Sequence, residues 1–309
     1  MNLFFIRTRL ECLIAMRIVD KITPNDRYAV VFLYQKDREE DSTVVYELYN
    51  QFRNNAAFSH DVVGSSGVFN NLLRFIPAML IAWITGGACY LAVVGNLPLA
   101  LAARMMPWIT IKSFDDGAVN ILPNSHLYGK GPANGNTLKR KLTRGVFPNG
   151  VAEWMRERIT QHFTIFPNTP NIVDSKRLTV LDWDWSALLN SSDLDKLNSL
   201  IPNSIIVGTP HDEFPDPQAS RDLANKLLED ADLYVKHPRE KNWHKSDKVI
   251  QFHSPAESVL AHFAQFNRIT VYHFNSTVGY TLSNSPNIVL YNLVDPITRK
   301  LNPNTQLWK

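Results

Sequence analysis

Residues 76–103 read IPAMLIAWITGGACYLAVVGNLPLALAA and contain no charged side chain. A single helix of this length would be long enough to span a bilayer. A Gly-Gly pair at 86–87 interrupts the run, however, and Gly-Asn at 95–96 starts another turn, which leaves a short apolar segment between them. Buried strands of parallel sheets are continuous apolar runs of this kind. The stretch therefore predicts a helix, a buried strand and a second helix, with a transmembrane span as the alternative.

Short apolar runs alternate with segments of helical spacing along the rest of the chain as well. The predicted strands are residues 3–6, 28–33, 90–94, 108–112, 205–207, 233–235, 269–274 and 288–290. The predicted helices include residues 10–20, 44–52, 150–159, 218–229 and 255–265. This alternation is typical of the α/β class with parallel sheets, and the number of strands is enough for two sheets.

The length of 309 residues exceeds one average domain and indicates two. A Pro- and Asn-rich segment at 164–171 is followed by a polar segment at 174–177 and by an acidic aromatic patch at 182–185. We therefore predict a boundary near residue 180, with an N-terminal domain over 1–180 and a C-terminal domain over 181–309.

Charge and cysteine content argue against several functions. Lys plus Arg number 32 against 29 Asp plus Glu, and a net charge of +3 is too small to indicate nucleic acid as a partner. Cys12 and Cys89 stand in apolar runs without zinc-ligand spacing, which is typical of a reducing compartment. The N-terminus lacks the basic segment of a secretory signal peptide, so a cytoplasmic protein is expected. The sequence also lacks four common motifs of enzymes. These are the phosphate-binding loop of P-loop proteins, the G-x-G-x-x-G dinucleotide-binding motif, the G-x-S-x-G nucleophile motif of hydrolases and the H-E-x-x-H motif of zinc proteases.

The first candidate motif, Phe114-Asp115-Asp116-Gly117, directly follows a predicted strand. Asp-Gly is a common turn dipeptide, because Gly tolerates positive φ and Asp bonds to nearby backbone amides. Two carboxylates at the carboxyl edge of a parallel sheet also stand where open α/β folds bind ligands. The motif is therefore either a turn or the source of a general base for a substrate hydroxyl.

The second candidate is the segment LYVKHPR at 233–239, which places His237 at the end of a predicted strand. Pro238 restricts the backbone of the residue before it. A lone histidine is often structural, but an imidazole with an ordinary pKa of about 6.5 is suited to donate a proton or a hydrogen bond to a departing phosphate. Lys236 and Arg239 would add positive charge toward such an anion.

Further loops of the second half carry hydroxyl groups after predicted strands. Ser276 and Thr277 stand where they could cap a helix or hold a phosphate beside its free amides. Gly208 and Thr209 form another loop at the same edge of the predicted sheet.

Two acidic positions have strong structural explanations. Ser254, Pro255 and Glu257 form the pattern of a capping box, which by itself accounts for Glu257. The segment His-Asp-Glu at 211–213 could hold a metal, but it stands among prolines and is predicted to be a solvated loop.

The order of these motifs resembles the bacterial sialyltransferases, in which an acidic-acidic-Gly motif, a His-Pro motif and a late Ser/Thr motif recur. In length, in its first strand and apolar helix, and around residues 234–238 and 276–282, the chain is similar to glycosyltransferase family 52, the lipooligosaccharide sialyltransferases and their capsule relatives. The resemblance implies a GT-B fold of two Rossmann-like domains facing a central cleft, with the acceptor bound by 1–180 and the CMP-sugar by 181–309. It also implies an inverting enzyme that moves sialic acid from CMP-sialic acid to a terminal galactose of a lipooligosaccharide or capsule glycan, in α-2,3 linkage.

The resemblance also implies roles for individual residues. Asp115 or Asp116 would be the general base on the acceptor hydroxyl, and Asp115 is preferred. His237 would be the acid toward the CMP phosphate, with Pro238 fixing its backbone. The donor-binding residues would be Gly208 and Thr209 in a loop, Glu257 at the ribose, and Ser276 and Thr277 at the phosphate. No metal and no other cofactor would be required.

Residues 7–11, Arg-Thr-Arg-Leu-Glu, depart from the family, whose members tend to have a Thr-Pro-Leu-Gln-like loop there, and this leaves the acceptor contacts of that segment open. Lipid-linked acceptors and the basic cluster Lys139-Arg140-Lys141 suggest peripheral contact with the inner face of the cytoplasmic membrane. A homodimer is left open. The alternative functions are a glycosyltransferase with another nucleotide-sugar donor and a catalytically inactive glycan-binding relative.

Overall fold

The chain divides into two units, Met1–Asp182 and Trp183–Lys309, next to the boundary predicted near residue 180. The computed structural model describes residues 1–34, 42–63, 68–92, 94–122, 125, 127–128, 143–167, 169–241, 246–295 and 300–302. Each unit contains one sheet of parallel strands with helices packed on it, so the α/β class is confirmed.

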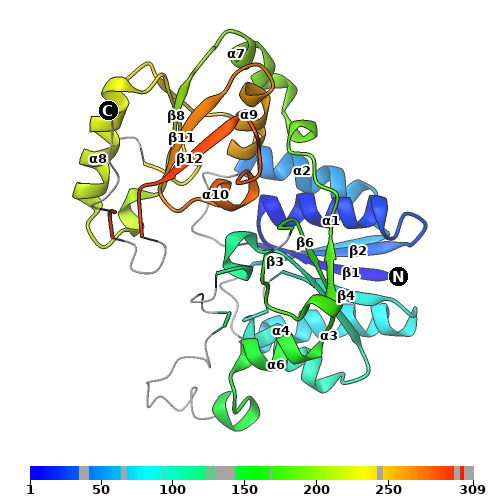
Figure 1. Ribbon diagram of the computed structural model, residues 1–309. Coiled ribbons are helices and arrows are strands. Elements are labelled where there is room, and N and C mark those ends of the chain that lie inside the picture. The colour runs from blue at the N-terminus through cyan, green and yellow to red at the C-terminus, as the bar shows by residue number, and fades with distance from the viewer. Residues whose placement is uncertain are drawn as a thin grey trace. The chain divides into compact units, whose positions relative to one another are not determined.

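The sheet of the first unit has the strand order β3-β2-β1-β4-β5-β6-β7. Figure 1 shows α1 and α2 on one of its faces and α3, α4 and α6 on the other. The strands are β1 (Asn2–Ile6), β2 (Tyr28–Tyr34), β3 (Phe58–Val63), β4 (Ala88–Leu91), β5 (Thr110–Phe114), β6 (Ile159–Thr164) and β7 (Leu178–Val180). The helices are α1 (Arg9–Lys21), α2 (Ser42–Asn54), α3 (Val68–Ile84), α4 (Leu97–Met105) and α6 (Val151–Arg158).

The apolar run at 76–103 forms the helix, strand and helix predicted from its glycine breaks, namely α3, β4 and α4. A Cβ added at Gly87 would lie 1.9 Å from the carbonyl oxygen of Met1, so only glycine allows β4 to start this close to β1. All four residues of β4 are buried, between β1 and β5. No helix among the described residues is long and apolar enough to cross a membrane.

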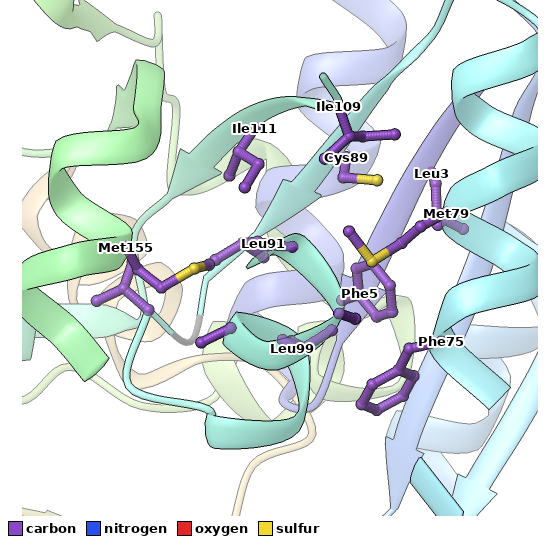
Figure 2. Packing of buried hydrophobic residues seen from close by; sticks show 14 of the residues in the cluster. Leu3, Phe5, Phe75, Met79, Cys89, Leu91, Leu99, Ile109, Ile111 and Met155 are labelled. Atoms are coloured by element: carbon purple, nitrogen blue, oxygen red, sulfur yellow. The ribbon is translucent and has the colours of Figure 1, made fainter. Parts of the chain in front are cut away.

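A hydrophobic core fills the space between this sheet and the helices α3, α4 and α6 (Figure 2). Leu91 of β4 and Leu99 of α4 are among its members, each at most 2% exposed. Each large aliphatic or aromatic side chain buried in this way contributes about 1.5–3 kcal/mol relative to an exposed one. Cys89 belongs to the same core, and both cysteines are buried and form no disulfide.

The second unit contains a smaller sheet with the order β10-β9-β8-β11-β12. Its strands are β8 (Ser204–Val207), β9 (Leu233–Val235), β10 (Val249–Ile250), β11 (Ile269–His273) and β12 (Ile288–Asn292). Its helices are α7 (Leu194–Asn198), α8 (Pro217–Asp230), α9 (Ala256–Ala264) and α10 (Val278–Thr281).

Each sheet has one point at which the order of its strands reverses. The reversal lies between β1 and β4 in the first unit and between β8 and β11 in the second. Open α/β sheets bind ligands outside the carboxyl ends of their strands at such a point. The loops after β1, β4 and β5 in the first unit and after β8, β9 and β11 in the second are therefore where ligands are expected.

Four strands escape the sequence patterns, namely β3, β6, β7 and β10. The strand β6 reads ITQHFT and buries the polar side chains of His162 and Thr164, so it lacks an apolar run. The strand β10 has only two residues, and β7 has three. Polar residues buried by hydrogen bonding and very short strands leave no periodicity to detect.

Candidate active site

The Asp115 carboxylate is completely buried at the carboxyl end of β5. Its Oδ1 accepts hydrogen bonds from His162 Nε2 at 3.0 Å and from Asn171 Nδ2 at 3.3 Å, and its Oδ2 accepts one from the backbone N–H of Ile165 at 2.7 Å. Ser113 Oγ lies 2.7 Å from the other ring nitrogen of His162. Asp115 thus ties β5 to β6 and the segment after it, and both its oxygens are occupied.

Asp116 has the opposite surroundings, although it is the next residue. Its side chain is 15% exposed and forms an ion pair with Arg7, at 2.6 Å between Asp116 Oδ2 and Arg7 Nη2. The backbone N–H of Asp116 donates to Asn120 Oδ1 at 2.7 Å, and Gly117 follows at a φ of 72°, in the left-handed region that favours glycine. This turn places the Asp116 carboxylate at the edge of the sheet, beside the loop after β1.

The contact of Arg7 with Asp116 and that of Glu11 with Arg7 were not predicted from the sequence. Thr8 caps α1 by accepting a hydrogen bond from the backbone N–H of Glu11 at 3.3 Å, and Glu11 Oε2 accepts one from the backbone N–H of Arg7 at 2.6 Å. Glu11 is fully buried. A Thr followed three residues later by Glu is a helix-start pattern, so this cap was detectable, whereas the contact with a carboxylate 109 residues away was not.

The second unit holds a cavity of about 220 Å³ at the carboxyl ends of β8, β9 and β11. Five residues predicted to bind the donor or its phosphate line it, namely Gly208, Thr209, His237, Ser276 and Thr277. The other lining residues are Pro210, Glu213, Phe214, Arg239, Phe274, Asn275 and Val294. Pro238 and Glu257 are not among the residues that line the cavity, and neither is Lys236.

A buried polar network lies behind the cavity, against Gly208. A Cβ added at Gly208 would lie 2.3 Å from Glu240 Oε2 and 2.8 Å from the Tyr234 ring. Tyr234 donates from its hydroxyl to Glu240 Oε1 at 2.7 Å, and the backbone N–H of His237 donates to Glu240 Oε2 at 3.2 Å. The residue after β8 must therefore be glycine, and Glu240 fixes the backbone of His237.

His211 contradicts the prediction of a solvated loop at 211–213, because it is 2% exposed and belongs to the same network. Its Nδ1 lies 2.6 Å from Ser220 Oγ and its Nε2 lies 3.2 Å from the Tyr234 hydroxyl. The two acidic residues that follow form ion pairs. Asp212 pairs with Arg221 and Lys241, and Glu213 pairs with Arg239. Among the described residues, no three His, Cys, Asp or Glu side chains gather as a metal site would require.

His237 faces the cavity as a neutral imidazole. Burial, and then the neighbouring Arg239, lower its pKa from 6.5 to about 4, against the opposite effect of Glu240. The backbone N–H of Arg239 donates to His237 Nδ1 at 3.0 Å, which leaves the proton of the neutral ring on Nε2. His237 is therefore suited to donate a hydrogen bond from Nε2 to an anion.

The Ser276 loop is held in shape by the end of β11. Asn275 has a φ of 54°, and its backbone N–H donates to Asn292 Oδ1 at 2.9 Å. The backbone N–H of Ser276 donates to His273 Nδ1 at 3.2 Å. Thr277 is the N-cap residue of α10 without a capping hydrogen bond from its side chain, so its hydroxyl is not needed for the cap.

The predicted capping box at Ser254 is wrong. The N-cap of α9 is Pro255, whose side chain makes no capping hydrogen bond. The hydroxyl and the backbone N–H of Ser254 both donate to Asp193 Oδ2, each at 2.7 Å, because this buried carboxylate needs donors. Glu257 lies in the first turn of α9.

Two doubly wound parallel units, each with polar residues at the switch point of its sheet, define the GT-B class of fold, as the sequence predicted. The model of glycosyltransferase family 52 matches residues 25–298, and the chain belongs to this family. It is therefore an enzyme of the glycosyltransferase class.

Several curated proteins are similar to most of the chain. An N-acetyllactosaminide alpha-2,3-sialyltransferase of Neisseria meningitidis is 25% identical, with 94% of this chain and 78% of that protein covered. A protein of the same name from Haemophilus influenzae is 25% identical, with 93% and 90% covered. A CMP-N-acetylneuraminate:beta-galactoside alpha-2,3-sialyltransferase of Pasteurella multocida is 26% identical, with 64% and 62% covered.

Solved structures resemble the chain in fold. An alpha/beta-galactoside alpha-2,3-sialyltransferase of Photobacterium phosphoreum has a TM-score of 0.53 at 12% identity, with 95% of this chain and 91% of that chain covered. A UDP-N-acetylglucosamine 2-epimerase of Rickettsia bellii also has a TM-score of 0.53, at 14% identity, with 97% and 80% covered. Because a transferase and an epimerase match equally well, this likeness concerns the fold alone.

Proposed function

We propose that the chain is an inverting sialyltransferase that moves sialic acid from CMP-sialic acid to a terminal galactose of a lipooligosaccharide or capsule glycan, in α-2,3 linkage. The observation that carries the proposal is the cavity of the second unit, where His237, Ser276 and Thr277 come together from two loops. The names of the family's relatives support the sugar and the linkage.

The cavity fits a nucleoside monophosphate. Hydroxyls of Ser276 and Thr277 and the Nε2–H of His237 supply neutral hydrogen-bond donors, and Arg239 supplies a cation that Glu213 holds in the free chain. Gly208 and Thr209 also line the cavity. Glu257 remains our candidate for the ribose hydroxyls, from a position outside the lining of this cavity.

The transfer step needs a base and a stabilised leaving group. The base takes the proton of the galactose hydroxyl, and that oxygen attacks the anomeric carbon of the sialic acid. The bond from that carbon to the phosphate oxygen breaks, and its electron pair leaves with CMP. His237 stabilises the departing phosphate by the hydrogen bond from its Nε2–H, which stays on the ring. The proton removed from the galactose hydroxyl remains on the base and passes to water after the product leaves. No step requires a metal.

We assign the base to Asp116 rather than to Asp115, which the sequence favoured. Asp115 is completely buried and both its oxygens accept hydrogen bonds, so an acceptor hydroxyl has no access to it. Asp116 is partly exposed at the carboxyl edge of the sheet. A general base must come within hydrogen-bond reach of the proton that it removes.

CMP release from CMP-sialic acid, measured in EDTA with and without lactose, tests the proposal. We expect sialyl-lactose to form with the native chain and to be lost in His237→Ala. If galactosides give no product with CMP-sialic acid but another nucleotide sugar is consumed, the donor is wrong. If no nucleotide sugar is consumed at all, the inactive glycan-binding alternative replaces the proposal.

The proposal includes peripheral contact with an anionic membrane surface. The cluster Lys139-Arg140-Lys141 lies outside the described residues, but α3, the last residue of α4 and the segment after it offer a second surface. The exposed apolar side chains there include Leu80, Ile81, Trp83, Ile84, Met105 and Trp108. The rings of Trp83 and Trp108 have centroids 5.4 Å apart.

The charge of this region also favours an anionic surface. From Val62 to Phe114 the sequence contains no Asp or Glu, whereas Arg74 and Arg104 are exposed. Apolar and Trp side chains beside cations suit an anionic lipid interface.

Flotation with vesicles at low salt tests this contact. We expect binding to anionic vesicles, weak binding to zwitterionic ones, and loss of binding in Ile84→Glu. Ile201→Glu is the matched control, because Ile201 is 77% exposed against 68% for Ile84 but lies in the second unit. If binding is lost only when residues 139–141 are neutralised, the contact belongs to that cluster. If the native chain does not float with anionic vesicles, the membrane contact is refuted.

A further inference from the structure

The segment in which this chain departs from the family resemblance lies directly against Asp116. Arg7 Nη2 is 2.6 Å from Asp116 Oδ2, and Arg7 Nε is 3.5 Å from Glu11 Oε1. The exposed fractions of the side chains are 24% for Arg7, 15% for Asp116 and 0% for Glu11. One guanidinium therefore bridges two carboxyl groups, of which a substrate can reach only Asp116.

The surroundings of Glu11 indicate that its carboxyl group carries a proton. Its Oε2 accepts a 2.6 Å hydrogen bond from the backbone N–H of Arg7, but its buried Oε1 has no hydrogen-bond partner among the described residues. An ionised oxygen without a partner is costly to bury, whereas a protonated one can donate.

Electrostatics agree with this geometry. Burial and then the Asp116 carboxylate raise the pKa of Glu11 well above its usual range, and Arg7 only partly opposes them. When two carboxyl groups share a site, one of them keeps its proton. Burial, and then the neighbouring Glu11, raise the pKa of the Cys12 thiol as well.

We propose that Arg7 and Glu11 are positioning residues for Asp116, in that Arg7 holds the Asp116 carboxylate in one orientation at the edge of the sheet while Glu11 fixes Arg7 from behind. The inference rests on the proposed function, because Asp116 is the base only in that reaction. Glu11 is buried and touches no substrate. Its effect on transfer therefore passes through Arg7 and Asp116.

The ratio of transfer to donor hydrolysis tests the inference. Sialyl-lactose formation and CMP release into water are measured on the same preparations of Glu11→Ala and Glu11→Gln. We expect Glu11→Ala to lower this ratio by about tenfold or more, because the acceptor hydroxyl depends most on the oriented base. Glu11→Gln should restore the ratio to within about threefold, because an amide reproduces the shape and one donor of the protonated acid.

The separation of kcat from KM gives a second measurement that a purely structural role would not change. Without the guanidinium the Asp116 carboxylate loses its orientation, so Arg7→Gln should lower kcat for transfer by about tenfold while leaving the KM for CMP-sialic acid within about twofold. Glu157→Gln, at an exposed glutamate of α6 in the same unit, is the control and should leave the ratio, kcat and KM unchanged.

The possible failures are distinct. If the native chain transfers no sialic acid, the proposed function fails and this inference with it. If the native chain is active and Glu11→Ala keeps the native ratio, only the positioning role fails. A folded Glu11→Gln variant with a low ratio would show that an ionised Glu11 is needed and would overturn the protonated form. If Glu11→Ala does not fold, Glu11→Gln and Arg7→Gln still decide.

Discussion

At the scale of single residues, burial separates two neighbouring carboxylates that look alike in the sequence. We predict that Asp116→Asn lowers kcat for transfer by about 10²–10⁴-fold while leaving the denaturation midpoint nearly unchanged, because it removes a base at the edge of the sheet. Asp115→Asn should instead destabilise the fold by about 1–3 kcal/mol, since its amide would place a donor against donors. Urea denaturation and transfer rates on both variants measure the two effects. A normal transfer rate in Asp116→Asn would return the base to Asp115.

Two histidines of the second unit, His237 and His273, lead to a titration prediction. Burial lowers the pKa of His237 and of His273 from 6.5 to about 4. We expect both rings to be neutral at pH 7 in histidine NMR spectra, and CMP to raise the pKa of His237 because a phosphate favours the charged ring. His273 is 3% exposed beneath α10 and serves as the internal control. A ring of His237 that is charged at pH 7 without ligand would contradict the assigned geometry.

What the sequence could predict at this scale depended on distance along the chain. His237, Ser276 and Thr277 each follow a strand that has an apolar run, and the carboxyl ends of parallel strands meet at one edge. The burial of Asp115, which distinguishes it from Asp116, could not be predicted. Its hydrogen-bond partner His162 lies in β6, a strand that has no apolar pattern. The contact of Arg7 with Asp116 joins segments 109 residues apart and leaves no local trace.

At the scale of elements, the turn after β8 depends on the absence of a side chain. We predict that Gly208→Ala destabilises the second unit by about 1–3 kcal/mol and weakens CMP binding, because its Cβ would meet Glu240 and Tyr234 and displace the backbone of His237. Gly145→Ala is the matched control, since nothing lies within 4 Å of its added Cβ. Calorimetry and CMP titration of both variants measure the effects. Equal stability of the two variants would mean that the network behind Gly208 relaxes freely.

The elements also show where local patterns fail. The sequence at Ser254 matches a capping box, but its hydroxyl donates a hydrogen bond to the buried Asp193 carboxylate instead. The N-cap of the helix is therefore the next residue, Pro255. The glycine breaks in the run at 76–103 were decisive in the opposite way, because Gly87 meets backbone from β1 at a distance no side chain tolerates. Tertiary contacts thus overrode the first pattern and reinforced the second.

At the scale of the whole molecule, the neutral histidines link stability to pH. Between pH 4 and 6.5 an unfolded chain binds protons at His237 and His273 that the folded chain does not bind. Their contribution to stability is therefore complete above about pH 6.5 and is lost as the pH falls toward 4, at up to about 1.4 kcal/mol per pH unit for each group. Urea midpoints measured from pH 7 to 4.5 should fall, and less steeply in His237→Gln. An unchanged slope in this variant would exclude His237 as a source.

The division into two units, each with its own sheet and core, makes ligand binding separable along the chain. We predict that CMP alone, added to the full chain, slows amide hydrogen exchange in the loops after β8, β9 and β11, because these loops line the cavity. The loop after β5 that carries Asp116 should exchange at its unliganded rate until an acceptor sugar is also present. Hydrogen exchange followed by mass spectrometry resolves the two sets of peptides. Protection by CMP at Asp116 without protection at Gly208, His237 and Ser276 would place the nucleotide in the first unit and would contradict the assignment of the donor site.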